Sequence, residues 1–260
     1  MIKRAQLFLF LLLLTSKLVT SQEQKLPNIY HSFTYEIGVN WLKEGNLFPI
    51  VHKGSINGLT YRFEKSGKNY HEVSVTLRYN KLKAKLETEK VSQNEQFGLG
   101  YCMGFHLMQK EKINLYIGYN LKYVFSLVEF PVWDESRAYW ATSFTSGISN
   151  RLFLNIKENL SWIVSWDINP MGLYSRPDEV RLYAQEKWTF PNIVKITNRG
   201  IKPGFINNVF LTNFRTEYRF LTKKDHYFAL LYSFSYSRTK KTNEHPMQNT
   251  INNFGISLGF

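Results

Sequence analysis

The chain has 260 residues, a formal charge of +13 and one cysteine, and these values already exclude several classes of protein. The length suits one domain or at most two. A single cysteine, Cys102, cannot form an internal disulfide, so a disulfide-stapled secreted fold is excluded. The Lys and Arg residues are scattered rather than gathered in a stripe, which argues against a nucleic-acid partner and favours a basic surface near anionic lipid headgroups.

The N-terminal segment has the pattern of a secretory signal peptide. Two basic residues come first, an apolar run from Leu7 to Leu14 follows, and small residues surround Ser21. The run is much shorter than the ~20 residues of a spanning helix, so a membrane anchor is the weaker interpretation. We predict a signal peptide over residues 1–21 and a single exported domain over residues 22–260.

Ten later segments alternate bulky apolar residues with small or polar ones, which predicts strands. In chain order they are residues 33–41, 56–64, 71–79, 97–107, 113–125, 139–149, 160–168, 210–220, 227–237 and 251–260. In the fifth, bulky residues stand at every odd position from Ile113 to Phe125, while Asn114 and Gly118 belong to the other face. This segment is long enough to cross a bilayer at a tilt, which takes ~9 to 11 residues.

The links between these segments alternate in length. Short links follow the second, fourth, sixth and eighth segments, and longer links follow the first, third, fifth, seventh and ninth. Short turns on one side and long loops on the other are typical of outer-membrane barrels, whose turns face the periplasm. We therefore predict an all-β fold, a transmembrane antiparallel up-and-down β-barrel of about ten strands with both chain ends on the periplasmic side.

The seventh link, residues 169–207, is the longest and is expected to form a large outer loop. Loops of this length are usually functional or disordered. Alternating apolar residues from Val180 to Ala184, and a second apolar group from Trp188 to Ile196, favour β structure of its own, as a hairpin or a lid. A barrel of twelve strands that uses this stretch is the alternative, although a proline in the second group makes a poor spanning strand.

The chain ends on NNFGISLGF, in which Phe254, Ile256, Leu258 and Phe260 share one face. With this ending and the alternation before it, the sequence resembles the small transmembrane β-barrels of the bacterial outer membrane, whose final strand usually ends in an aromatic residue. The resemblance covers nearly all of residues 22–260 and implies a location in the cell outer membrane. It also implies that Phe260 belongs to the signal read by the barrel-assembly machinery, but it implies no activity.

The apolar face is too bulky for the inside of a small barrel. It carries many large side chains, including Trp41, Trp162 and Trp166, whereas a barrel of this size has room inside for a layer of side chains or one small ligand. We therefore prefer a lipid-facing apolar surface over a soluble exported barrel or sandwich. The opposite face, rich in glycine and serine, is then expected to line a narrow polar lumen.

Charged residues share this second face, and we predict that they form a network in the lumen. A midplane Arg or Lys that faced lipid would cost about 2 to 4 kcal/mol, so the lumen is the favourable place. Two interpretations stay open, a selectivity lining and a set of paired ions that fills the lumen, and we favour the second. The predicted network consists of Glu36, Arg62, Glu64, Glu72, Arg78, Lys122, Asp167, Arg215, Glu217 and Arg219.

No motif in the sequence predicts catalytic residues, a metal site or a cofactor. Most histidines fall near short turns, whereas His52 and His245 are expected in outer loops, where they could serve as bases. Neither has a recognisable partner, and the Asp-x-Asp followed by Asp-x-His of the ten-stranded omptin proteases is absent. Cys102 stands alone among glycines that follow strand alternation, so it is interpreted as a small buried filler and not as a ligand.

These features favour an integral outer-membrane barrel with a structural or surface-binding role and a lumen filled by ion pairs. The alternatives are a porin-like narrow channel for small solutes and an outer-membrane hydrolase or lipid-modifying enzyme, and the enzyme is disfavoured. The expected partners are outer-membrane lipids and the barrel-assembly machinery, together with an unidentified protein outside the cell or in the periplasm.

Overall fold

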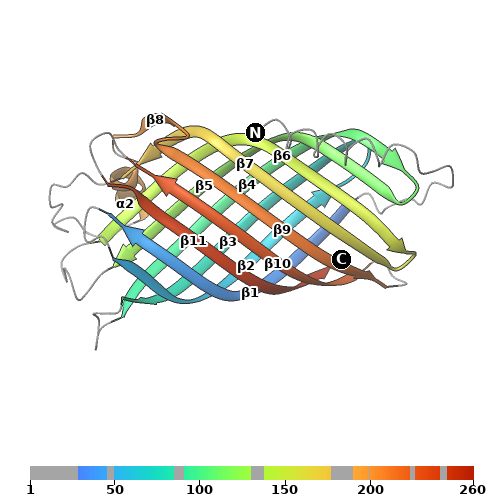
Figure 1. Cartoon of the computed structure of the whole chain (residues 1–260), viewed down its shortest axis with the longest axis horizontal. Coiled ribbons are helices and arrows are strands. Elements are labelled where there is room, and N and C mark those ends of the chain that lie inside the picture. Colours follow the sequence, from blue (N-terminus) through green and yellow to red (C-terminus); the bar gives the residue numbers. More distant parts are fainter. Residues whose placement is uncertain are drawn as a thin grey trace, which may run out of the picture.

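Ten antiparallel strands form a closed barrel, which confirms the predicted fold class and strand number (Figure 1). The computed structural model describes residues 29–45, 50–84, 91–129, 138–176, 190–198, 200–222, 226–240 and 245–260. The barrel strands are β1 (Ile29–Glu44), β2 (Val51–Lys65), β3 (Asn69–Lys83), β4 (Ser92–Lys110), β5 (Ile113–Glu129), β6 (Ala138–Lys157), β7 (Leu160–Ser175), β9 (Val209–Leu221), β10 (Tyr227–Thr239) and β11 (Met247–Gly259). β1 pairs with both β2 and β11, which closes the circuit. The predicted signal peptide lies outside the described residues.

Short turns and long connections alternate along the chain, as predicted. Only Glu111 and Lys112 separate β4 from β5, whereas residues 176–208 separate β7 from β9. We call the two ends of the barrel the turn end and the loop end. The shortest barrel strands have 13 residues, more than the ~9 to 11 that a tilted spanning strand needs. The barrel wall therefore continues beyond the hydrocarbon layer.

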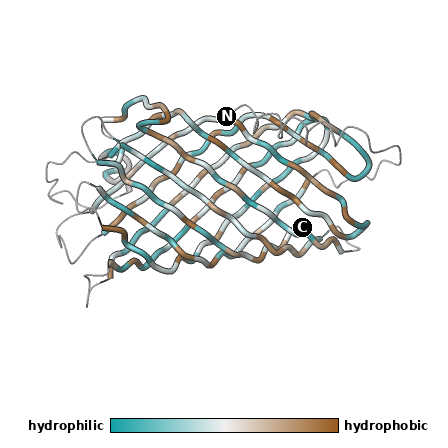
Figure 2. The backbone as a smooth tube through the Cα atoms, in the orientation of Figure 1, coloured by the Kyte–Doolittle hydropathy of each residue, from teal (hydrophilic) through white to brown (hydrophobic). Residues whose placement is uncertain are grey.

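The alternation along each strand separates an apolar outer face from a polar inner face, and Figure 2 shows the two kinds of residue following one another along the strands. On β1, Phe33, Tyr35 and Ile37 are exposed, while Thr34 and Glu36 are buried. The last strand and the residue after it place their alternate apolar side chains on the outer face, namely Phe254, Ile256, Leu258 and Phe260. An apolar wall of this extent is suited to lipid and not to water.

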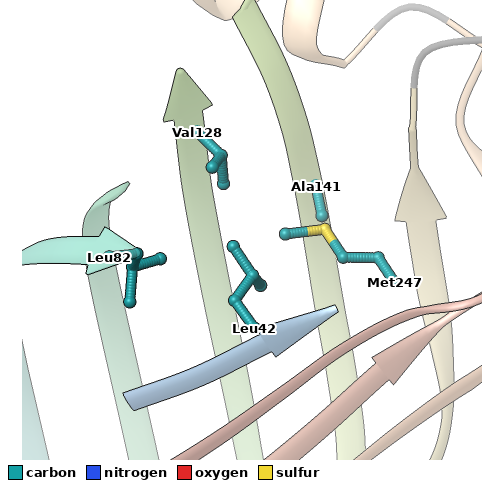
Figure 3. Close-up of a cluster of buried hydrophobic side chains, with 5 residues drawn as sticks. All are labelled: Leu42, Leu82, Val128, Ala141 and Met247. Carbon is teal, nitrogen blue, oxygen red and sulfur yellow. The ribbon is translucent and has the colours of Figure 1, made fainter. Parts of the chain in front are cut away.

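Apolar side chains pack inside the barrel near both ends. At the loop end, buried residues from five strands point toward one another (Figure 3), and we call them the loop-end cluster: Leu42, Leu82, Val128, Ala141 and Met247. At the turn end, two neighbouring groups form what we call the turn-end clusters: Tyr70, Cys102, Tyr116, Phe153 and Ile163, and then Tyr30, Tyr227 and Ala229. The buried position of Cys102 agrees with its interpretation as a small filler.

The connection between β7 and β9 contains a helix, so the expected β structure is wrong for its second apolar group. α2 (Phe190–Thr197) and the short strand β8 (Lys202–Phe205), which pairs with β7, lie at the loop end of the barrel (Figure 1). Pro191 stands in the first turn of the helix, where a backbone N–H would have no helical partner in any case. Within the described residues, no helix is long and apolar enough to cross a membrane.

The ten-stranded circuit also overturns the alternative of twelve strands. β7 runs on to Ser175, so the long connection begins later than residue 169. Residues 180–184, the other part of the expected hairpin, lie outside the described residues.

Candidate functional site

The ten predicted lumen residues all occupy inward-facing positions, on β1, β2, β3, β5, β7 and β9. Several of their ion pairs join strands that are not neighbours in the barrel, so the side chains reach across the lumen. The structure adds Arg151 of β6, which the sequence analysis missed. The predicted segment ended at residue 149, and one further step of the same alternation would have reached Arg151.

Four residues form a ring that bridges the lumen between β2 and β9, and we call it the cross-lumen ring. Arg62 Nη1 donates to Glu64 Oε1 and to Glu217 Oε2, each at 3.1 Å. Arg219 Nη2 lies 3.0 Å from Glu64 Oε2 and 2.9 Å from Glu217 Oε1. Each guanidinium thus touches both carboxylates, and the charges of the ring cancel. A buried arrangement of this kind is stable only while every partner is present.

A second group of five residues, the side network, lies between β3, β5, β6, β7 and β9. Arg215 Nη2 lies 2.9 Å from Glu72 Oε2. Arg151 joins the two carboxylates of the network, at 2.6 Å from Asp167 Oδ1 and 3.5 Å from Glu72 Oε1. Lys122 Nζ completes it, at 2.7 Å from Asp167 Oδ2. Arg215 Nε also lies 3.8 Å from Glu217 Oε2, which connects the side network to the cross-lumen ring.

The remaining predicted pair lies between β1 and β3. Arg78 Nη2 lies 2.9 Å from Glu36 Oε2, and Asn253 Nδ2 donates to the same oxygen at 2.9 Å. Thr60 Oγ1 donates to the other carboxylate oxygen at 3.4 Å. Every acidic residue of the predicted network therefore has a basic partner.

A polar cavity of about 140 Å³ lies beside the networks in the middle of the lumen. Small residues such as Gly98, Gly100 and Ser233 line it, and it has room for several water molecules. Toward the loop end lies a smaller space of about 30 Å³, bordered by Ala141 and Met247 of the loop-end cluster. Ion pairs, a polar cavity and an apolar layer thus follow one another along the barrel axis.

Aromatic rings cover the cross-lumen ring on the side of the turn end. The Arg219 guanidinium lies over the ring of Tyr227, 4.1 Å from its centroid, and 5.5 Å from the centroid of Tyr30. Such cation–π contacts are strongest where water is excluded. Tyr70, from the neighbouring turn-end cluster, donates its hydroxyl to Glu72 Oε2 at 2.8 Å.

The mouth at the loop end holds a buried ion pair that the sequence analysis also missed. Arg176, directly after β7, pairs with Glu44 at the end of β1. Its Nη1 donates to the backbone oxygens of Thr239 at 3.1 Å and His245 at 2.8 Å. The expectation that His52 stands in an outer loop is wrong, because β2 begins at Val51 and buries His52 inside the barrel. Among the described residues, no group of His, Cys, Asp or Glu is arranged to hold a metal ion.

No family model and no curated protein matches this chain. Solved structures do match: the outer-membrane protease OmpT from Escherichia coli aligns with a TM-score of 0.50 and 6% identity over 92% of this chain and 98% of OmpT. The transport unit of the autotransporter AIDA-I from Escherichia coli aligns with a TM-score of 0.45 and 8% identity over 96% and 95% of the two chains. Neisserial surface protein A aligns with a TM-score of 0.35 and 7% identity over 89% and 97%.

At these identities the likeness to OmpT shows the fold alone. This chain has the fold of the β-barrels of bacterial outer membranes, and its apolar outer wall agrees with that fold. It carries a buried salt-bridge network in its lumen.

Proposed function

We propose that this chain is a closed barrel with a structural or surface-binding role, and that it conducts no solutes in its resting form. The observation that carries the proposal is the cross-lumen ring, in which Arg62 of β2 and Glu217 of β9 meet at 3.1 Å across the lumen. A path for solutes would have to separate these buried charges, and breaking a buried ion pair costs about 3 to 5 kcal/mol.

The loop end supports a role in surface binding. The longest connection, residues 176–208, emerges there and carries α2 and β8. In outer-membrane barrels the long loops face outside the cell. The Glu44–Arg176 pair fixes the start of this connection to β1, so its base is held in place. We therefore propose that this connection meets an extracellular partner.

Export and assembly are proposed to depend on the two ends of the chain. Residues 1–21 act as the signal peptide, and Phe260 is read by the barrel-assembly machinery. Phe260 is exposed on the outer wall, and its backbone exchanges hydrogen bonds of 2.8 and 2.9 Å with His31. The last residue therefore stands at the seam where β11 meets β1, which is where closure of the barrel is completed.

Planar bilayers test the closed lumen. The purified full-length protein is expected to produce little current, whereas steady open-channel currents would favour the narrow channel and turn the lumen charges into a selectivity lining. Protease treatment of intact cells tests the outward connection, which should be cut between residues 176 and 208. Protection of this connection on intact cells would contradict the proposed surface role.

The enzyme remains the weaker alternative. OmpT is described as a protease, but its likeness to this chain extends to the fold alone. A hydrolytic or lipid-modifying activity of the purified barrel that disappears in His52→Ala or in His245→Ala would favour an enzyme over a binding protein.

A further inference from the structure

We propose that the outer wall of the barrel, over β1 to β5 near the loop end, binds one lipid whose headgroup carries more than one phosphate. An acyl chain of this lipid would lie in an apolar groove, and the phosphates would meet Lys53, Lys81 and Lys83. This proposal rests on the outer-membrane fold and not on the surface-binding role.

The groove has a volume of about 560 Å³ and lies on the outer face of the barrel. Leu59 and Leu77 stand opposite each other on β2 and β3 and are about half exposed. Asn57 also borders the groove, and its side chain is short. Tyr35 donates its hydroxyl to the Asn57 amide oxygen at 3.1 Å, so this oxygen already has a hydrogen-bond partner. The groove is lined mainly by apolar and aromatic side chains, including Tyr35, Leu59, Leu77, Tyr79, Phe97 and Phe125.

A groove of this composition favours hydrocarbon. Contact with an acyl chain covers apolar surface, whereas a polar ligand would find few partners along the groove. Its position on the lipid-facing wall also means that an acyl chain reaches it from the bilayer without entering water.

The three lysines lie directly beyond the groove in the direction of the loop end. Along β3, the outward residues Leu77 and Tyr79 are followed by Lys81 and Lys83. On the neighbouring strand, Lys53 pairs with Lys83 in the register. All three lysines are exposed, and within the described part of the chain none of them forms an ion pair.

The spacing of these lysines suits a headgroup with several phosphates. Neighbouring strands lie about 4.8 Å apart, and residues two apart on one strand are separated by about 6.7 Å. Lys53 Nζ lies over the ring of Trp41 on β1, 5.4 Å from its centroid, which orders the ammonium group at the level where aromatic residues meet lipid headgroups. A basic residue near an anionic membrane surface strengthens attraction to the lipid.

The acidic residue that borders the groove is Glu95 of β4, which stands opposite Tyr79 of β3. It stands on the groove side of Lys81 and Lys83, because Tyr79 precedes both lysines along β3. The headgroup would therefore lie on the loop-end side of Glu95, among the three lysines. Its acyl chain would extend from there along the groove toward the turn end.

Native mass spectrometry of the full-length protein in detergent tests the site, with diphosphoryl lipid A as the probe and its dephosphorylated form as the reference. We expect the phosphorylated lipid to be retained preferentially. The variant K53Q/K81Q/K83Q should lose affinity on the order of a hundredfold. The matched control K65Q/K68Q/K112Q, which removes three exposed lysines at the turn end, should retain the affinity of the unmodified protein.

A second variant tests the groove separately. Leu77→Trp adds bulk to an exposed outward position and should weaken binding of the acylated lipid about tenfold, while leaving binding of the deacylated phosphorylated headgroup unchanged. Equal retention of phosphorylated and dephosphorylated lipid, or equal losses in the two triple variants, would overturn the proposal. Unchanged lipid affinity in Leu77→Trp would overturn the groove as the acyl-chain site. Currents through the lumen would leave all of these expectations intact, because the site lies on the outer wall.

Discussion

Glu217→Ala tests the cross-lumen ring most directly. The Glu217 side chain is 0% exposed and contacts Arg62 at 3.1 Å and Arg219 at 2.9 Å. Its removal leaves two guanidinium groups with the single carboxylate of Glu64, so that a neutral buried ring acquires an unbalanced positive charge. We expect the free energy of unfolding to fall by about 3 to 5 kcal/mol.

The assay is urea unfolding of the barrel refolded into lipid vesicles, followed by tryptophan fluorescence and by the heat-dependent shift on gels. Glu95→Ala is the control, because Glu95 lies on the outer wall, and a surface substitution is expected to change stability by no more than about 0.5 kcal/mol. The double variant Arg62→Met with Glu217→Met should lose less than the sum of the single variants, because an apolar pair replaces the ion pair. A loss below about 1 kcal/mol for Glu217→Ala would show that water screens the ring, and the proposal of a lumen closed by buried ion pairs would have to be abandoned.

Three further predictions follow from the same geometry. Deletion of Phe260 should lower the amount of heat-modifiable barrel in the outer-membrane fraction while export continues, and normal membrane levels would show that Phe260 only packs against lipid. Arg151→Ala leaves Asp167 with Lys122 as its remaining basic partner and should lower the midpoint of urea unfolding. The control Lys157→Ala, a change at the turn end, should lower this midpoint far less, and equal midpoints for the two variants would contradict a buried network. Glu44→Gln removes the charge that holds Arg176, so the connection after β7 should be cut faster by protease, and an unchanged rate of cleavage would show that the pair does not anchor it.

The faces of the strands could be predicted from the sequence, but the contacts between strands could not. Because side chains alternate between the two faces of a strand, the sequence alone predicts that Arg62 and Glu217 face the lumen. Their pairing depends on strand order and stagger around the closed barrel, and 155 positions separate them in the chain. Arg215 and Glu72 were likewise expected in the same network, and only the closed barrel brings them to 2.9 Å.

Arg151, Glu44 and His52 were missed or misplaced for one reason, which is that the strands are longer than a bilayer requires. Arg151, Glu44 and His52 lie beyond the ends of the predicted segments, yet each occupies a strand in the structure. The alternation weakens near the rim, where both faces meet polar surroundings, so it no longer marks where a strand ends. The helix α2 was missed for a related reason, since a short apolar group fits a strand or a helix equally well.

The loop-end cluster leads to the last prediction. On one side of it lies the mouth, and on the other lies the cavity of about 140 Å³. Leu42→Ser combined with Met247→Ser would replace two buried apolar side chains of this layer with small polar ones and admit water from the mouth.

The water-filled space would then favour anions over cations. The basic side chains that border the cavity, Arg78, Lys122 and Arg215, are 16 to 20% exposed, whereas their carboxylate partners are 6 to 8% exposed. The basic side chains of the protein therefore present more charge to the cavity than its carboxylates do. Fixed positive charge at a narrow passage attracts dissolved anions. Because the cross-lumen ring still closes the lumen in this double variant, we expect no steady current. We expect instead that tryptophan fluorescence becomes more sensitive to quenching by iodide than in the unmodified protein, and that the increase for iodide exceeds the increase for caesium. If the cavity instead admitted cations more readily than anions, the prediction would be wrong. That result would mean that the carboxylates, and not the basic side chains, control the electrostatic field inside the barrel.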